Sequence, residues 1–138
     1  MAVLIGIFLL PAGAQACSCA PQAPAESLRE ADAAVTARLV AVLPHGPSQA
    51  LYRYEVRRVY KGEKLEAGRM LDVHSSRRSA ACALPRRIGR VYGLFLLSRH
   101  SRWFGSICRV VSPKRMQRVT QSQSADSARA PVQPVLCG

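Results

Sequence analysis

Apolar and polar residues alternate along much of the chain in the way that is typical of β-strands. Between Leu51 and Tyr60 the alternation is regular, with Tyr52, Tyr54 and Val56 on one side and charged residues on the other. This pattern predicts a half-buried strand. The other segments with the length and apolar content of strands are 33–43, 68–74, 90–98 and 103–111. Strands at this short spacing predict a sandwich or a barrel, and periodicity alone leaves both open.

Short helices and loops are expected around these strands. Residues 25–31 predict a short helix, and the proline and glycine content of residues 44–48 predicts a loop. Ser112 and Pro113 form a favourable helix start, because serine caps the first turn and proline is tolerated at its first position. Gly93, inside an apolar strand, indicates a bulge or a point of close packing.

The first residues have the pattern of a secretory signal peptide. Val3 to Leu10 is an apolar run, and Ala14-Gln15-Ala16 fits the small-x-small pattern that signal peptidase cuts. The run is shorter than the roughly 20 apolar residues of a membrane span. No lysine or arginine precedes it, so the signal is atypical, and a buried first strand or helix is the alternative. We expect cleavage after Ala16 and export to an extracellular or periplasmic space.

Cleavage at that point divides the chain into three parts. Residues 1–16 form the signal peptide, and residues 17–119 form one domain, since this length suits a single core. The helix that starts at Pro113 is expected to end near Val119. Residues 120–138 are polar and rich in proline, alanine and serine, which predicts a flexible C-terminal tail.

The cysteines are expected to crosslink this domain. Five are present, at positions 17, 19, 82, 108 and 137. Export brings them into an oxidising compartment, where cysteines pair. Since five is odd, one thiol is free or pairs with a second chain. A strand projects residues i and i+2 to the same side, so Cys17 and Cys19 can both reach the domain, each toward its own distant partner.

The charge balance is strongly basic. Lysine and arginine number 20 against 8 acidic residues, a formal net charge of +12, which attracts nucleic acid, anionic glycans or membrane surfaces. A GC-rich genome produces the same arginine-rich composition without selection for any partner. Export makes nucleic acid an unexpected partner. Binding of an anionic glycan through Arg57, Arg58, Arg86 and Arg87 stays open as an alternative function.

The common catalytic motifs are not found in the sequence. It contains no His-Glu-x-x-His, no Gly-x-Ser-x-Gly and no phosphate-binding glycine loop. His45, His74 and His100 are scattered, and the acidic residues show no pairing for acid–base chemistry. Most of those acids are expected to be solvated partners of arginines. We therefore expect no enzyme, no catalytic residues, and no cofactor or metal bound by the isolated protein.

The expected N-terminus carries the most informative chemistry. An α-amine has a pKa near 7.7–8.0, so a useful fraction of it is neutral at about pH 8. If Cys17 begins the mature chain, its neutral amine and its own carbonyl oxygen can close a five-membered chelate on a metal. Catalytic zinc keeps one coordination position open, which such a chelate can occupy. Ser18 would then point into a pocket of the partner. The alternative is that Cys17 and Cys19 only crosslink a secreted domain.

Several parts of the chain share features with one known family. They are Cys17-Ser18-Cys19-Ala20-Pro21, residues 31–40, residues 52–56 and 59–62, Cys82, residues 89–97 and residues 107–108. Over residues 17–113 the chain thereby resembles the netrin-like domain family, in particular the N-terminal domain of tissue inhibitors of metalloproteinases. The N-terminal motif and the cysteine spacing are the specific part of this resemblance.

The resemblance implies an all-β fold, an OB-like, five-stranded closed barrel with one or two short flanking helices. It also implies bridges Cys17–Cys82 and Cys19–Cys108, which leave Cys137 unpaired in a monomer or linking a dimer. It further implies a zinc metalloendopeptidase as partner, with its zinc bound by the amine and carbonyl of Cys17. The other implied contacts are Ser18, Cys19, Ala20 and Pro21 at the protease pocket and, on a secondary ridge, Ser79, Ala80, Ala81 and Cys82.

The chain also departs from that family. The animal inhibitors have a third bridge in this domain and a second, cysteine-rich domain, whereas here no cysteine lies between residues 20 and 81. A lipid-anchored envelope protein is a further alternative, although Ala14 stands where a lipobox has a branched aliphatic residue. A lipidated Cys17 would have neither a free amine nor a disulfide, so that alternative excludes zinc chelation.

Overall fold

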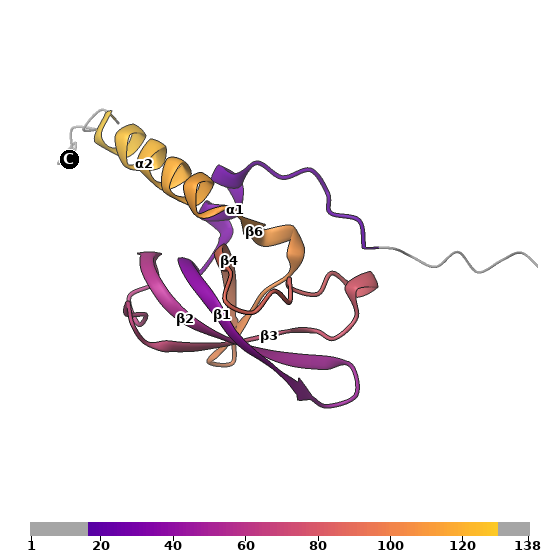
Figure 1. Cartoon of the computed structure of the whole chain (residues 1–138). Helices are drawn as coiled ribbons and strands as arrows, with labels where there is room; N and C mark the ends of the chain where they lie inside the picture. Colours follow the sequence, from indigo (N-terminus) through magenta and orange to yellow (C-terminus); the bar gives the residue numbers. More distant parts are fainter. Residues whose placement is uncertain (1–16, 130–138) are drawn as a thin grey trace, which may run out of the picture.

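A computed structural model describes residues 17–129 of the chain (Figure 1). The expected signal peptide and Cys137 lie outside the described residues. The described part is mainly β-strand, as expected, with its strands in one six-stranded sheet. Its elements are α1 (Pro24–Glu30), β1 (Ala33–His45), β2 (Gln49–Lys61), β3 (Met70–Ser76), the 3-10 helix η1 (Ser79–Ala81), β4 (Val91–Arg99), β5 (Arg102–Phe104), the 3-10 helix η2 (Ile107–Arg109), β6 (Val110–Val111) and α2 (Pro113–Arg129).

The strand pairings run in a cycle. β1 pairs with β2 and also with β4, both antiparallel. β2 pairs with β3, β3 pairs with β5 in parallel, and β5 pairs with β4. Each of the strands β1 to β5 therefore has two partner strands, and β6 adds a short pairing to β4. The buried side chains of these strands form the main core.

The alternation predicted for the second strand is confirmed. β2 buries Tyr52, Tyr54 and Val56, and the residues between them are more exposed. These three side chains pack in the main core with residues from β1, β3 and β4, among them Leu39 and Val73. Because side chains of a strand alternate between its two faces, one regular segment of sequence is enough to orient the whole strand.

β1 and β4 are buried on both faces. On the side away from the main core, Ala34 and Phe95 pack with Leu28 of α1 and Met116 of α2. The two helices contact each other and lie over the same end of the sheet (Figure 1). This second cluster explains why β4 is almost continuously apolar, as is typical of a strand that is covered on both sides.

Gly93 is a point of close packing in β4. A Cβ atom on this residue would lie 2.9 Å from Cγ2 of Val111 and 3.1 Å from Cβ of Met116. Glycine therefore lets β6 and the first turn of α2 approach β4 closely.

We expect the substitution Gly93→Val to lower the free energy of unfolding by about 2 kcal/mol, because the new side chain must displace Val111 and α2. Thermal unfolding followed by circular dichroism measures the effect. Arg99→Val, at an exposed position of the same strand, is the control and should change stability by less than about 0.5 kcal/mol. A valine variant at position 93 with wild-type stability would show that β6 and α2 move aside freely.

α2 is longer than the sequence analysis predicted. It is a helix of 17 residues that ends at Arg129, so residues 120–129 of the expected tail are helical. The side-chain amide of Gln123 donates a hydrogen bond of 2.9 Å to the carbonyl oxygen of Ala25 in α1. The prediction was wrong here because it judged the segment by its polar composition, whereas a polar helix can be held by a few contacts with its neighbours.

Two other boundaries are corrected. The segment 103–111 is not one strand, because β5 ends at Phe104 and the turn of η2 separates it from β6. That turn brings Cys108 to Cys19. The loop predicted at 44–48 begins later, since β1 continues to His45 and pairs there with β2.

Candidate functional site

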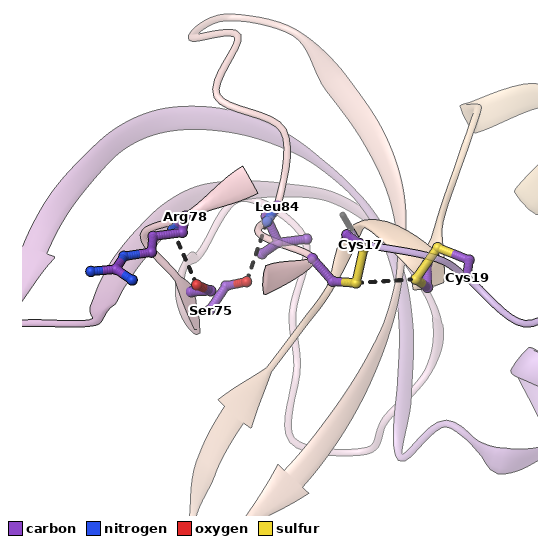
Figure 2. Close-up of a disulfide and its surroundings, with 8 residues drawn as sticks. Cys17, Cys19, Ser75, Arg78 and Leu84 are labelled. Atoms are coloured by element: carbon purple, nitrogen blue, oxygen red, sulfur yellow. Dashed lines mark hydrogen bonds between the residues drawn. A yellow bond between two sulfur atoms is a disulfide. The ribbon is translucent and has the colours of Figure 1, made fainter. Parts of the chain in front are cut away.

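Two disulfides fix the first described residues to the domain (Figure 2). Cys17 is bonded to Cys82 and Cys19 to Cys108, with Cα–Cα distances of 5.1 and 5.3 Å. These are the two pairs that the family resemblance implies. The Sγ atoms of Cys82 and Cys108 lie 3.8 Å apart, so the bridges are neighbours (Figure 2). The segment is thus attached at two positions that are separated by a single residue.

The loop that carries Cys82 is itself held in place. Cys82 follows η1 with a left-handed backbone, at a φ of 58°. Its carbonyl oxygen accepts a hydrogen bond of 3.1 Å from the amide of Ile107, next to Cys108. The buried hydroxyl of Ser75 accepts a hydrogen bond of 3.2 Å from the amide of Leu84 (Figure 2). The loop therefore gives the N-terminal segment a well-defined support.

Residues 17–21 and 79–82 together form one surface, called the N-terminal ridge below. Its exposed residues are Ser18, Cys19, Ala20 and Pro21 from the first segment and Ser79, Ala80 and Ala81 from η1. Cys17 and Cys82, which join the two segments, are half-buried. The structure thus brings together the residues that the resemblance implies as protease contacts.

A side-chain cluster also ties the segment after the ridge to the domain. The carboxylate of Glu30 accepts hydrogen bonds from the Gln22 amide at 2.9 Å and from the Arg109 guanidinium at 3.0 Å. These two donors, the Gln22 amide first, lower the pKa of the Glu30 carboxyl. This cluster was not predicted from the sequence, because its members are far apart in the chain.

Three sulfur atoms lie close together at the ridge, two from its first segment and one from Cys108 of η2. The Sγ atoms of Cys17, Cys19 and Cys108 lie within 4.8 Å of one another. Cysteine binds metals as a thiolate, and a sulfur atom in a disulfide carries no such charge. The group is therefore a pair of crosslinks. A lipid thioether on Cys17 and the Cys17–Cys82 bridge exclude each other.

His45 and His74 are less isolated than the sequence analysis expected. Their ring centroids lie 5.0 Å apart, because β1 extends to His45. Burial and then the neighbouring His45 and Arg102 lower the pKa of His74. Within residues 17–129 no third histidine, cysteine or carboxylate joins the pair in a metal-binding group. His100 lies elsewhere, in the turn between β4 and β5.

The four arginines proposed for glycan binding do not form one patch. The guanidinium of Arg86 donates a hydrogen bond of 3.3 Å to the hydroxyl of Tyr52, near the start of β2. Arg58 lies six positions further along that strand, about 20 Å away at roughly 3.3 Å per residue. Arg57 is beside it and pairs with Glu55 at 3.8 Å.

Three acidic residues pair with arginines, as expected. The closest pairs in the described structure are Arg38–Glu55 at 2.6 Å, Arg53–Asp72 at 2.8 Å and Arg109–Glu30 at 3.0 Å. A second set of arginines flanks η1 in the sequence, and it shares Arg86 and Arg87 with the four that were proposed for glycan binding. Residues 77–90 contain five arginines and no acidic residue, a run that is visible in the sequence.

None of the helices within residues 17–129 has the length and apolar composition needed to cross a membrane. No protein-family model matches the chain, and no curated protein matches it significantly.

Proposed function

We propose that this chain is a secreted inhibitor of zinc endopeptidases that acts through the N-terminal ridge. The observation that carries the proposal is the double attachment of the ridge, by Cys17–Cys82 and Cys19–Cys108. We also propose that the fold is the OB-like closed barrel of netrin-like domains, which the cycle of strand pairings supports.

The proposed chemistry is chelation of the protease zinc by Cys17. Signal-peptide cleavage after Ala16 would make Cys17 the first residue and free its α-amine. Amine and carbonyl oxygen then occupy the coordination position that a catalytic zinc keeps open for water or substrate. Ser18, which is exposed between the two bridged cysteines, enters the neighbouring pocket. Ala20, Pro21 and the exposed residues of η1 cover the rest of the cleft.

The geometry favours such a role over simple crosslinking. One disulfide is sufficient to hold a chain end against a domain, but two at alternate positions also restrict its orientation. A chain end that is ordered before binding loses little conformational freedom in the complex, which raises affinity. Disulfides also form and persist mainly in oxidising compartments such as those that exported proteins enter, which supports the proposed secretion.

Adding one alanine before Cys17 tests the proposal. We expect inhibition to weaken by about 100-fold or more, as for other residues that dominate an interface, because the amine becomes an amide and can no longer bind zinc. Inhibition constants against a panel of secreted zinc endopeptidases measure the effect.

Mass mapping of the unreduced variant must show the same two bridges, so that the change is confined to the amine. Full inhibition by the extended chain would rule out chelation by Cys17. An acylated Cys17 in the native protein would rule it out as well.

A further inference from the structure

Five arginines lie in the segments of chain before and after η1, and none of them forms a salt bridge in the described structure. They are Arg77, Arg78, Arg86, Arg87 and Arg90, called the arginine rim below, and all are exposed. The salt bridges within residues 17–129 involve other arginines, namely Arg38, Arg53, Arg57 and Arg109. Arg115 and Arg118 of α2 are also outside these salt bridges, so the rim differs from them by its place on both sides of η1, which belongs to the ridge.

Hydrogen bonds order part of the rim. The guanidinium of Arg86 donates to the hydroxyl of Tyr52 at 3.3 Å and to the carbonyl oxygen of Arg77 at 2.5 Å. The guanidinium of Arg77 donates to the carbonyl oxygen of Gly46 at 3.3 Å. A cation that is already held in place loses less side-chain entropy when a partner binds.

The rim is continuous with the ridge. Ser79–Cys82, the η1 part of the ridge, lies between Arg78 and Arg86 in the sequence. The amide of Arg78 donates a hydrogen bond of 3.1 Å to the hydroxyl of Ser76. Its side chain points away from the two disulfides (Figure 2). A partner that covers the ridge therefore meets the rim at its margin.

We propose that the arginine rim selects protein partners whose surface beside the bound cleft is rich in aspartate and glutamate. This inference rests on the proposed function, since the ridge determines where the partner sits. A guanidinium matches a carboxylate in a two-pronged geometry that lysine does not offer. Charges at the margin of an interface mainly accelerate association and reject partners of like charge. The target is thus a zinc endopeptidase with an acidic margin around its active-site cleft.

Charge reversal at two rim positions, R78E/R87E, tests this selection. Neither side chain makes a hydrogen bond or salt bridge in the described structure, so the fold should be retained. The matched control is R115E/R118E, which changes the net charge equally on exposed positions of α2, away from η1 (Figure 1). The probes are two zinc endopeptidases of known structure, one with an acidic and one with a basic cleft margin, and a glutamate-rich peptide.

For the acidic-margin protease, we expect R78E/R87E to slow association about tenfold at low salt and to flatten its salt dependence, as for other steered encounters. The control should change the rate less than about twofold, since its charges are remote from the interface. An equal loss in the control would overturn the proposal, because net charge alone would then explain it. The proposal would also be overturned if the wild-type protein associated with the basic-margin protease as fast as with the acidic-margin protease.

The peptide separates this inference from zinc chelation, because it contains no metal. If neither protease is inhibited, the proposed function fails. Peptide binding then decides whether the rim selects carboxylate-rich partners. A loss of peptide affinity of about tenfold in R78E/R87E alone would support the selection of carboxylates by the rim. Unchanged peptide affinity would overturn it. Tighter binding of dextran sulfate than of a peptide of equal charge would replace the protein partner with an anionic glycan.

Discussion

Replacing Cys19 and Cys108 together by serine is expected to lower the free energy of unfolding by about 4 kcal/mol, because this bridge restricts a long loop of the unfolded chain. The two cysteines are 89 residues apart. Cys17–Cys82 remains, so the chain end stays attached at one point. Under the proposed function, inhibition of a sensitive zinc endopeptidase is expected to weaken about 100-fold, since the chain end proposed to bind zinc loses its fixed orientation. Chemical denaturation and inhibition assays on one preparation measure both effects.

Cys137→Ser is the control for that experiment. This variant also replaces cysteine by serine, at a position that belongs to neither bridge. The unfolding free energy of the monomer and the inhibition should therefore stay at the wild-type level. Wild-type inhibition by C19S/C108S would mean that a single bridge is enough to orient Cys17. The second bridge would then have no role in inhibition.

Phe95→Ala is expected to cost about 4 kcal/mol of unfolding free energy, because it removes a large side chain from a site that cannot collapse fully. Phe95 is 1 % exposed and packs where α1, α2 and β1 meet. The substitution removes apolar contacts between the two helices and the sheet. We therefore expect amide hydrogen exchange in α2 to accelerate more than exchange in β2.

The conservative variant Phe95→Leu keeps most of the apolar volume and should cost less than about 1.5 kcal/mol. Thermal and chemical unfolding of both variants give the comparison. A loss below about 1 kcal/mol for the alanine variant would contradict the close packing of this second cluster.

The strands were the most predictable part of this protein. A strand needs only an alternating pattern and a turn at each end, and Tyr52, Tyr54 and Val56 satisfy that rule within a few residues. The order of the strands in the sheet was less accessible. The pairing of β3 with β5, for example, joins two segments in which nothing in the sequence of one indicates the other as its partner. The expectation of a closed barrel came from the family resemblance and not from periodicity.

The candidate site was predictable where it depends on covalent chemistry. The resemblance implied the two cysteine pairs, which the structure contains. The protease contacts implied at 17–21 and 79–82 stay a prediction. The clusters that depend on packing were missed. Gln22, Glu30 and Arg109 meet only because α1 and η2 are brought together. Of the arginine rim, Arg86 and Arg87 were named as candidates for glycan binding. Arg77, Arg78 and Arg90 were missed, because the charge was interpreted mainly over the whole chain.

The close approach of the two bridges affects how the ridge responds to reduction. If a dithiol reductant opens Cys19–Cys108, the freed Cys108 thiolate lies beside the Cys82 sulfur, which was 3.8 Å away in the intact protein. Thiolates exchange with nearby disulfides. Attack on Cys82 would form a Cys82–Cys108 bond and release the Cys17 thiolate. One reduction would thereby detach the chain end at both points, while the strands stay paired.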